Sequence, residues 1–301
     1  MQNDNTGIAG PYNDEYASSY NNIWIHSDAW APEARNHVKT ISELLTPDTN
    51  WLDAGCGTGY FLSQFPGVNR AGFDLSQAML KQAGKANPDI QFLRQMNLLD
   101  EASEWNGMWK LVTCTGQPFS YLATVNEAEK VATNLANWTS KDGKCVVTGV
   151  DINDFTYNEL PAYYSEADIQ EDIPFIPAVI WSLKEAGEVT HTNMIAPGID
   201  QWVRWFSKFF HKIEVNCWPH DPPFLRVPRR IVICSEKRDA NDKRPATIVL
   251  HPLASGKGHS AIYPSLSALS NKQLIFALMQ RFKSGELFRA AKRKIAHKLK
   301  K

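Results

Sequence analysis

Hydrophobic positions follow two different periods through the middle of the chain. Short apolar runs alternate with segments whose apolar residues recur every three or four positions. The runs predict buried strands, and the segments between them predict amphipathic helices. The expected strands are 50–54, 69–73, 90–93, 110–115 and 144–150, and the expected helices are 58–65, 76–86 and 125–139. Ser76 is the expected N-cap of the second helix, and Asp142–Gly143 an expected turn. This alternation predicts a parallel sheet with helices on both faces.

After Val150 the alternation stops. Residues 151–177 are acidic and aromatic and predict a loop-rich cover, and 179–195 predict a hairpin that turns at 185–188. An amphipathic helix over 199–210 and two strands over 211–218 and 230–235 follow. We therefore expect a Rossmann-like, doubly wound α/β domain over residues 49–237. Its sheet should have seven strands, with an antiparallel last strand and an inserted cover and hairpin over 151–198.

The two ends of the chain have patterns of their own. Tyr12, Tyr16 and Tyr20 are four residues apart and share one helical face. Together with a helical pattern over 32–45 they predict an N-terminal helical segment over 1–48, and a stripe of this kind usually packs in the core. Residues 238–269 predict a linker, and 270–301 a basic amphipathic helix in which Glu286 is the only acid after Arg281. That helix is interpreted either as a solvated face or as a segment that docks on an anionic membrane or an acidic partner.

Composition narrows the class of protein. The 301 residues have a formal net charge of zero and are 43% hydrophobic, which suits a packed core and gives no general affinity for nucleic acid. The five cysteines are odd in number and lack CxxC spacing, so we expect free thiols in a reducing compartment and no metal. The first residues are polar, and no apolar run approaches the roughly 18 residues that span a bilayer. A cytoplasmic location is expected, with peripheral membrane association through the C-terminal helix as an alternative.

The sequence from Trp51 to Tyr60 is a strand, a glycine-rich turn and the start of a helix. Asp53 ends the strand, and three glycines follow at alternate positions, Gly55, Gly57 and Gly59. Such a turn lets backbone N–H groups approach an anionic group. Asp74 ends the next predicted strand 21 positions later, close to where an acid contacts ribose in nucleotide-binding α/β folds. The two features together predict a nucleotide site.

This D-x-G-x-G-x-G arrangement resembles the first motif of the class I S-adenosylmethionine (SAM) methyltransferases, and the likeness covers roughly residues 10–237. The resemblance implies SAM as the cofactor, with Asp74 on the ribose and Asn97 in place of an Asp that holds the adenine amine. It also implies that the N-terminal helices form a lid over 1–48 that contacts the cofactor and the acceptor. The implied cofactor residues are Tyr16, Arg35, Asp53, Ala54, Gly55, Cys56, Gly57, Gly59, Asp74, Leu75, Met79, Met96, Asn97, Leu98, Thr115 and Gly116.

The end of the fourth strand resembles the G-N-S-F-x-H-L stretch of glycine and sarcosine N-methyltransferases and the related segment of amino-sugar N-methyltransferases. Gly116, Phe119 and Leu122 match, whereas Gln117 takes the Asn position and Tyr121 the His position. The resemblance puts Gln117 between cofactor and acceptor. A hydroxyl acceptor needs a base, whereas an amine needs only to arrive unprotonated. The candidate catalytic residues are Gln117, Tyr121, Asp151, His191 and His220.

These observations predict a SAM-dependent methyltransferase that acts on nitrogen or oxygen of a small polar metabolite, either an amine or a sugar-like molecule. One alternative is a lipid-linked or polymeric saccharide, with the basic C-terminal helix holding the enzyme at a membrane. Another is a non-catalytic SAM-binding scaffold. Nucleic acid is not expected as a partner, because the Asn-Pro-Pro-Tyr type of motif is absent and the cations gather only at the C-terminus. The oligomeric state stays open.

Overall fold

The computed structural model describes residues 12–27, 30–150, 168–172, 178–185, 188–218 and 229–251. The chain divides into two compact units, Met1–Ser260 and Ala261–Lys301. All elements below belong to the first unit. The predicted helix over 270–301 lies outside the described residues.

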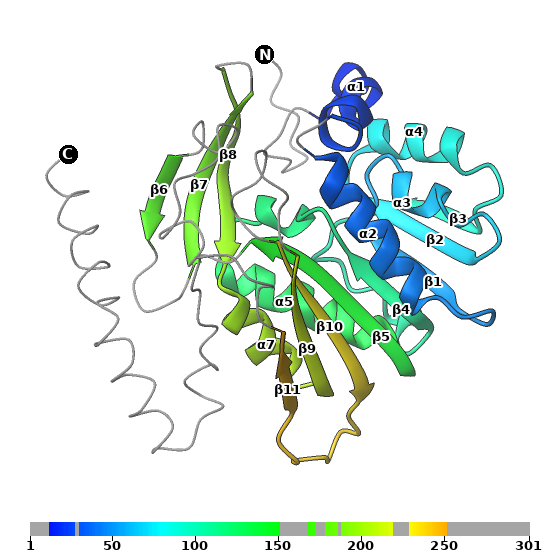
Figure 1. Cartoon of the computed structure of the whole chain (residues 1–301), viewed down its shortest axis with the longest axis vertical. Coiled ribbons are helices and arrows are strands. Elements are labelled where there is room, and N and C mark those ends of the chain that lie inside the picture. The colour runs from blue at the N-terminus through cyan, green and yellow to red at the C-terminus, as the bar shows by residue number, and fades with distance from the viewer. Residues whose placement is uncertain are drawn as a thin grey trace, which may run out of the picture. The chain divides into compact units, whose positions relative to one another are not determined.

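The first unit is built on one eight-stranded sheet, in the order β11-β9-β10-β5-β4-β1-β2-β3 (Figure 1). Strands β1 to β5 pair in parallel, whereas β10 is antiparallel to both of its neighbours, β5 and β9. The predicted Rossmann-like sheet with an antiparallel last strand is therefore present. The strands are β1 Asn50–Ala54, β2 Asn69–Asp74, β3 Phe92–Gln95, β4 Trp109–Cys114, β5 Thr139–Val150, β9 Phe210–Trp218, β10 Arg229–Lys237 and β11 Thr247–Leu250.

The structure corrects two predictions about this sheet. The strand count of seven is wrong, because Thr247–Leu250, predicted as linker, pairs in parallel with β9 as an eighth strand. The predicted turn at Asp142–Gly143 does not precede the strand, because β5 begins at Thr139. It falls in an irregularity within β5, where Thr139 and Lys144 pair with Trp109 and Leu111 and the register with β4 shifts. A Cβ on Gly143 would lie 2.8 Å from the Trp109 carbonyl oxygen. The glycine therefore allows close backbone contact inside a strand, and its presence does not end the strand.

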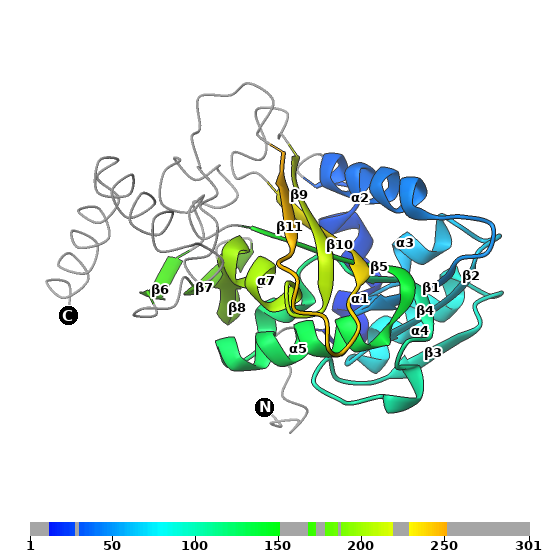
Figure 2. The same ribbon diagram turned by 90° about the horizontal axis from the view of Figure 1, so that it is seen from below.

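Helices lie on both sides of the sheet, as the alternating pattern predicts. Figure 2 shows α2 on one side and α5 and α7 on the other. Ser76 is the N-cap of α4, where its hydroxyl accepts the Met79 N–H at 3.2 Å, as predicted. A capping box between Thr124 and Glu127 begins α5. The helices are α1 Asp14–Trp24, α2 Ala31–Leu44, α3 Tyr60–Ser63, α4 Gln77–Ala86, α5 Val125–Trp138 and α7 Ile199–Phe206, with 3-10 turns η1 Ser103–Trp105 and η2 Pro118–Tyr121.

A second sheet of three strands follows β5 in the chain. The predicted hairpin is present as β7 Ala178–Glu185 and β8 Glu188–Pro197, which pair antiparallel. A third strand, β6 Asp168–Asp172, pairs with β7 within the segment predicted to be loop-rich. The hairpin matters for the site because β8 carries His191.

The core of the first unit is aromatic and contains free thiols. Trp51, Phe73 and Trp138 are at most 1% exposed. Cys56, Cys114, Cys145 and Cys234 are free and buried, as predicted, and burial raises the pKa of each thiol. None of the described helices is both long and apolar enough to cross a membrane.

Candidate functional site

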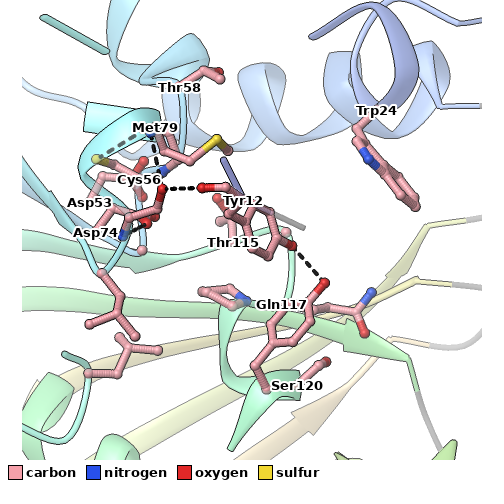
Figure 3. A pocket seen from close by; sticks show the side chains of 18 of the residues that line it. Tyr12, Trp24, Asp53, Cys56, Thr58, Asp74, Met79, Thr115, Gln117 and Ser120 are labelled. Carbon is pink, nitrogen blue, oxygen red and sulfur yellow. Dashed lines mark hydrogen bonds between the residues drawn. The ribbon is translucent and has the colours of Figure 1, made fainter. Parts of the chain in front are cut away.

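A cavity of about 440 Å³ opens where β1 and β4 lie side by side at their carboxyl ends. The chain runs from β1 outward to β2 and β3 on one side and returns to β4 and β5 on the other, so the strand order reverses at this point. Loops diverge at such a reversal, which is why open α/β sheets bind ligands there. Figure 3 shows Asp53, Cys56, Asp74 and Met79 grouped on one side of this cavity and Trp24 across it.

The glycine turn takes a backbone conformation that other residues rarely adopt. Gly55, Gly57 and Gly59 have φ values of 73°, 54° and 69°. A Cβ on Gly55 would lie 2.6 Å from Cβ and Cγ of Pro118, and one on Gly59 would lie 2.7 Å from the Asn87 Nδ2. Backbone conformation and lack of space therefore both require glycine. Together they keep the loop against the start of η2 and the end of α4.

Asp74 is held by two backbone amides. Its Oδ2 accepts the Gly57 N–H and its Oδ1 accepts the Ser76 N–H, both at 2.9 Å. Burial raises the pKa of this carboxyl group, and the backbone hydrogen bonds oppose that rise. Because each carboxylate oxygen has two lone pairs, both oxygens can still accept a hydrogen bond from a ligand in the cavity. The loop and Asp74 thus form one rigid unit.

Asp53 is 2% exposed and ends a buried chain of hydrogen bonds. Trp51 Nε1–H donates to Thr113 Oγ1 at 2.8 Å, and the Thr113 hydroxyl donates to Asp53 Oδ1 at 2.6 Å. Burial raises the pKa of Asp53 to about 7; the Thr113 hydrogen bond opposes this rise and the charge of Asp74 adds to it. The carboxyl group therefore titrates near neutrality, and a cation nearby would favour its charged form.

Asn97 lines the cavity after β3 and is already part of a local turn. Its Oδ1 accepts the Leu99 N–H at 2.9 Å, and its own N–H donates to Asp100 Oδ2 at 2.9 Å. The amide oxygen keeps one lone pair, so the predicted adenine contact is compatible with the turn and stays a prediction.

Across the cavity, hydroxyl groups and one imidazole form a continuous network. The Tyr12 hydroxyl donates to the Tyr121 oxygen at 2.6 Å, and Tyr121 Oη lies 2.7 Å from His191 Nδ1. His191 Nε2 lies 3.4 Å from the Tyr16 hydroxyl, which accepts the Trp24 Nε1–H at 2.7 Å. The network joins the α1 region, η2 and β8. Tyr121 takes a His position in the segment that resembles N-methyltransferases, and here β8 supplies an imidazole beside it.

Two hydrogen bonds fix the α1 region to the cofactor side of the cavity. The Thr58 hydroxyl donates to Asn21 Oδ1 at 2.6 Å, and the Ser76 hydroxyl donates to the Tyr12 carbonyl oxygen at 2.9 Å. Thr58 belongs to the glycine turn, and Ser76 follows Asp74 by two residues. The same N-terminal segment therefore contacts both sides of the cavity.

Gln117 lies between the two sides in a strained conformation. Its φ is 64°, in the left-handed region that a non-glycine residue enters at a cost of about 1–2 kcal/mol. Its side chain lines the cavity (Figure 3), and Pro118 begins η2 immediately after it. Strain of this kind gathers at functional sites, where the surrounding structure imposes it.

Most of the predicted site residues that the structure describes line this one cavity. Four predicted cofactor residues do not. Ala54 and Gly59 are buried in the glycine turn. Tyr16 packs against His191 and is not among the residues that line the cavity. Glu33, Ala34 and His37 line the cavity from one face of α2. Arg35 lies on a different face of this helix and is exposed, so its position does not support the predicted contact with SAM. Asp151 and His220 lie outside the described residues. The predicted residues that do line the cavity are Asp53, Gly55, Cys56, Gly57, Asp74, Leu75, Met79, Met96, Asn97, Leu98, Thr115, Gly116, Gln117, Tyr121 and His191.

Sequence reasoning expected the N-terminal helices at the site but did not name most of the residues by which α1 and α2 line the cavity. Trp30, Glu33, Ala34 and His37 line the cavity at helical spacing, and this spacing was a signal that could have identified them. Tyr12 and Tyr20 line it as well, although only Tyr16 of the tyrosine stripe was named as a site residue. Helical spacing identifies a shared face, but it does not say whether that face meets core or cavity.

Comparison with known proteins gives partial matches. Residues 52–143 match the family model described as a methyltransferase domain. A curated relative, dTDP-4-amino-2,3,4,6-tetradeoxy-D-glucose N,N-dimethyltransferase of Saccharopolyspora spinosa, is 28% identical over 145 residues. The match covers 45% of this chain and 55% of the relative, so the chain spans about half the length of that protein.

Solved structures match over more of the chain at lower identity. The CcbJ methyltransferase of Streptomyces caelestis is 14% identical, with 76% of this chain and 99% of that chain covered and a TM-score of 0.49. A putative SAM-dependent methyltransferase of Listeria monocytogenes is 16% identical, with 68% and 100% covered and a TM-score of 0.48.

Proposed function

We propose that the chain, whose residues 52–143 match the methyltransferase domain family, transfers a methyl group from SAM to a small polar metabolite. The acceptor atom is nitrogen or oxygen. The observation that carries the proposal is the single cavity, which extends from Asp74 and the glycine turn to Gln117, Tyr121 and His191. Donor and acceptor can therefore meet inside one cavity.

On the cofactor side, Asp74 accepts both ribose hydroxyls, and the turn from Gly55 to Gly59 receives the methionine part of SAM. Leu75 and Met79 pack against the adenine. The two hydrogen bonds that already fix the Asp74 carboxylate support this role, because a preorganised acceptor loses little freedom on binding.

On the acceptor side, the composition of the wall suits a cationic or sugar-like molecule. Aromatic rings from Tyr20, Trp24 and Trp30 face the cavity, and aromatic faces attract ammonium groups. Glu33 and Glu127 line it too, whereas no Lys or Arg does so among the described residues. The curated relative is named as an N,N-dimethyltransferase of an amino sugar, which agrees with an amine acceptor.

The reaction requires alignment more than acid–base chemistry. The methyl group passes in line from a sulfonium to the nucleophile, and the leaving thioether is neutral, so correct positioning supplies much of the rate. We assign positioning to Gln117, whose strained backbone fixes it between the two sides. Residues 1–48 act as a lid and 151–198 as a cover in this proposal. Contacts from Thr58 and Ser76 to the α1 region support the first role, and the place of His191 supports the second.

Two measurements test the proposal. Calorimetric titration of the full chain with SAM should give saturable one-to-one binding. Incubation with methyl-labelled SAM and a cell extract, followed by separation into small-molecule, lipid and macromolecular fractions, should place the label in the aqueous small-molecule fraction. Label in lipid or polysaccharide would favour the membrane-bound saccharide alternative. SAM binding with no label in any fraction would favour the non-catalytic alternative.

A further inference from the structure

We propose that Tyr121 and His191 form a proton relay that removes a proton from the methyl acceptor, and that this acceptor is an amine that arrives as an ammonium ion. The inference rests on the proposed function and assigns its acid–base step. It joins two side chains that are 70 residues apart in sequence, in η2 and β8.

Hydrogen-bond geometry gives the relay a direction. Burial raises the pKa of Tyr12 well above its ordinary value, and the neighbouring tyrosines add to the rise, so Tyr12 keeps its proton and donates to Tyr121 at 2.6 Å. Tyr121 then directs its own proton to His191 Nδ1 at 2.7 Å. Tyr121 lines the cavity, and a phenolic oxygen is an acceptor as well as a donor, so it can meet a substrate N–H there.

The imidazole is held in place from its other side. Its Nε2 lies 3.4 Å from the Tyr16 hydroxyl, and His191 is only 1% exposed. The centroids of the Trp24 and Tyr121 rings lie 5.9 Å from its own, so both rings pack against the imidazole. Among the described side chains, the titratable groups in contact with His191 are Tyr12, Tyr16 and Tyr121.

The step balances as follows. An acceptor N–H bond breaks and its proton moves to the Tyr121 oxygen, while the Tyr121 O–H proton moves to His191 Nδ1. The imidazole becomes imidazolium, and the freed nitrogen lone pair attacks the methyl carbon. The S–CH₃ bond then breaks with its electron pair on sulfur, which leaves S-adenosylhomocysteine and a methylated ammonium. The imidazolium releases its proton to solvent when the site reopens.

The activity test uses pH to separate a relay from a structural role. His191→Gln and Tyr121→Phe are assayed with methyl-labelled SAM and two pairs of probes, glucosamine with glucose and ethanolamine with ethylene glycol. For a methylated amine, kcat/KM at pH 7 should fall by about 10²–10⁴-fold, the usual contribution of a general base. The loss should disappear at about pH 10, where the amine is already unprotonated, and SAM affinity should not change. The matched control His251→Gln, at an exposed position, should behave like the wild type.

The same assay can overturn the proposal. A loss that stays equal from pH 7 to pH 10, or no loss in either variant, contradicts the relay. Preferred methylation of the hydroxyl probes contradicts the amine acceptor.

A second measurement tests the relay in the absence of a methyl acceptor. Nitrogen-15 NMR of the histidine-labelled full chain, bound to S-adenosylhomocysteine, reports which ring nitrogen of His191 carries the proton. We expect it on Nε2, with Nδ1 accepting from Tyr121 and with the Nδ1 signal shifted in Tyr121→Phe. A proton on Nδ1 overturns the relay. Failure of the wild type to bind S-adenosylhomocysteine would instead overturn the proposed function.

Discussion

The two sides of the cavity are built in different ways. On the cofactor side, Asp53, the glycine turn and Asp74 lie within 22 consecutive residues, and their key groups are backbone amides and one carboxylate. On the acceptor side, Tyr12 and Tyr121 are 109 residues apart and Tyr121 and His191 are 70 apart. The first side is a local motif, and the second exists only when three distant segments meet.

This difference separates the expected effects of substitution. Changes on the cofactor side should appear as lost stability or lost SAM affinity, because the backbone itself forms the site. Changes on the acceptor side should alter turnover and leave SAM affinity intact. The predictions below test this separation, starting with the largest effect.

Gly55→Ala should cause the largest loss. The new Cβ would lie 2.6 Å from Pro118, and φ is 73°. Overpacking costs about 1–3 kcal/mol and the left-handed conformation about 1–2 kcal/mol. We expect urea denaturation to give a free energy of unfolding lower by about 2–5 kcal/mol. Gly67→Ala is the control, because nothing lies within 4 Å of its added Cβ. Equal stability of the two variants would contradict the structural role of Gly55.

Asp74→Ala should weaken SAM binding by at least about tenfold, since a charge-assisted hydrogen bond is worth roughly 1.5–3 kcal/mol. Asp74→Asn keeps the shape and one acceptor oxygen and should lose less. Calorimetry with SAM measures both variants. Unchanged affinity in the Ala variant would exclude Asp74 as the ribose contact.

SAM affinity should depend on pH through Asp53. The pKa of this carboxyl group is raised to about 7, so the folded chain holds a proton more tightly than the unfolded chain does. Its contribution to stability is complete below the ordinary pKa of 3.8 and is lost as pH rises through 7.

A cationic ligand binds the charged Asp53 carboxylate more tightly than the neutral carboxyl group. SAM affinity should therefore change with pH in the opposite direction to the contribution of Asp53 to stability. It should rise with pH, by up to about tenfold per pH unit below pH 7. Calorimetry from pH 5.5 to 8.5 measures this slope, and Asp53→Asn should flatten it. A flat profile in the wild type would mean that Asp53 does not contact the cation.

Gln117→Gly should have the smallest effect on folding and a clear effect on turnover. Glycine accepts a φ of 64° without strain, so stability should exceed that of Gln117→Ala by about 1 kcal/mol. Both variants remove the amide and should lower the rate of methyl transfer at unchanged SAM affinity. A Gly variant less stable than the Ala variant in urea would show that the position is not strained.

Local patterns were sufficient for the sheet and for the cofactor side. The strand and helix periods predicted the parallel core, Ser76 was identified as a cap, and Asp74 was identified from its distance to Asp53. These features depend on neighbours in sequence, so a one-dimensional pattern contains them. The errors occurred where contact partners are remote. Thr247–Leu250 is a strand because β9 offers an edge for it to pair with, and Asp142–Gly143 lies inside β5 because the strand pairs with β4 on both sides of these two residues.

The sequence by itself determined that this chain folds as a Rossmann-like α/β domain with a SAM-type glycine turn and an acid on the second strand. Only the tertiary structure decided that Tyr12, Tyr121 and His191 meet, that Arg35 is exposed and that the α1–α2 face lines the cavity. The physical reason is the range of the interactions. Backbone conformation and capping are set within a few residues, whereas a side-chain network across 109 residues forms only when the packed core brings its segments together.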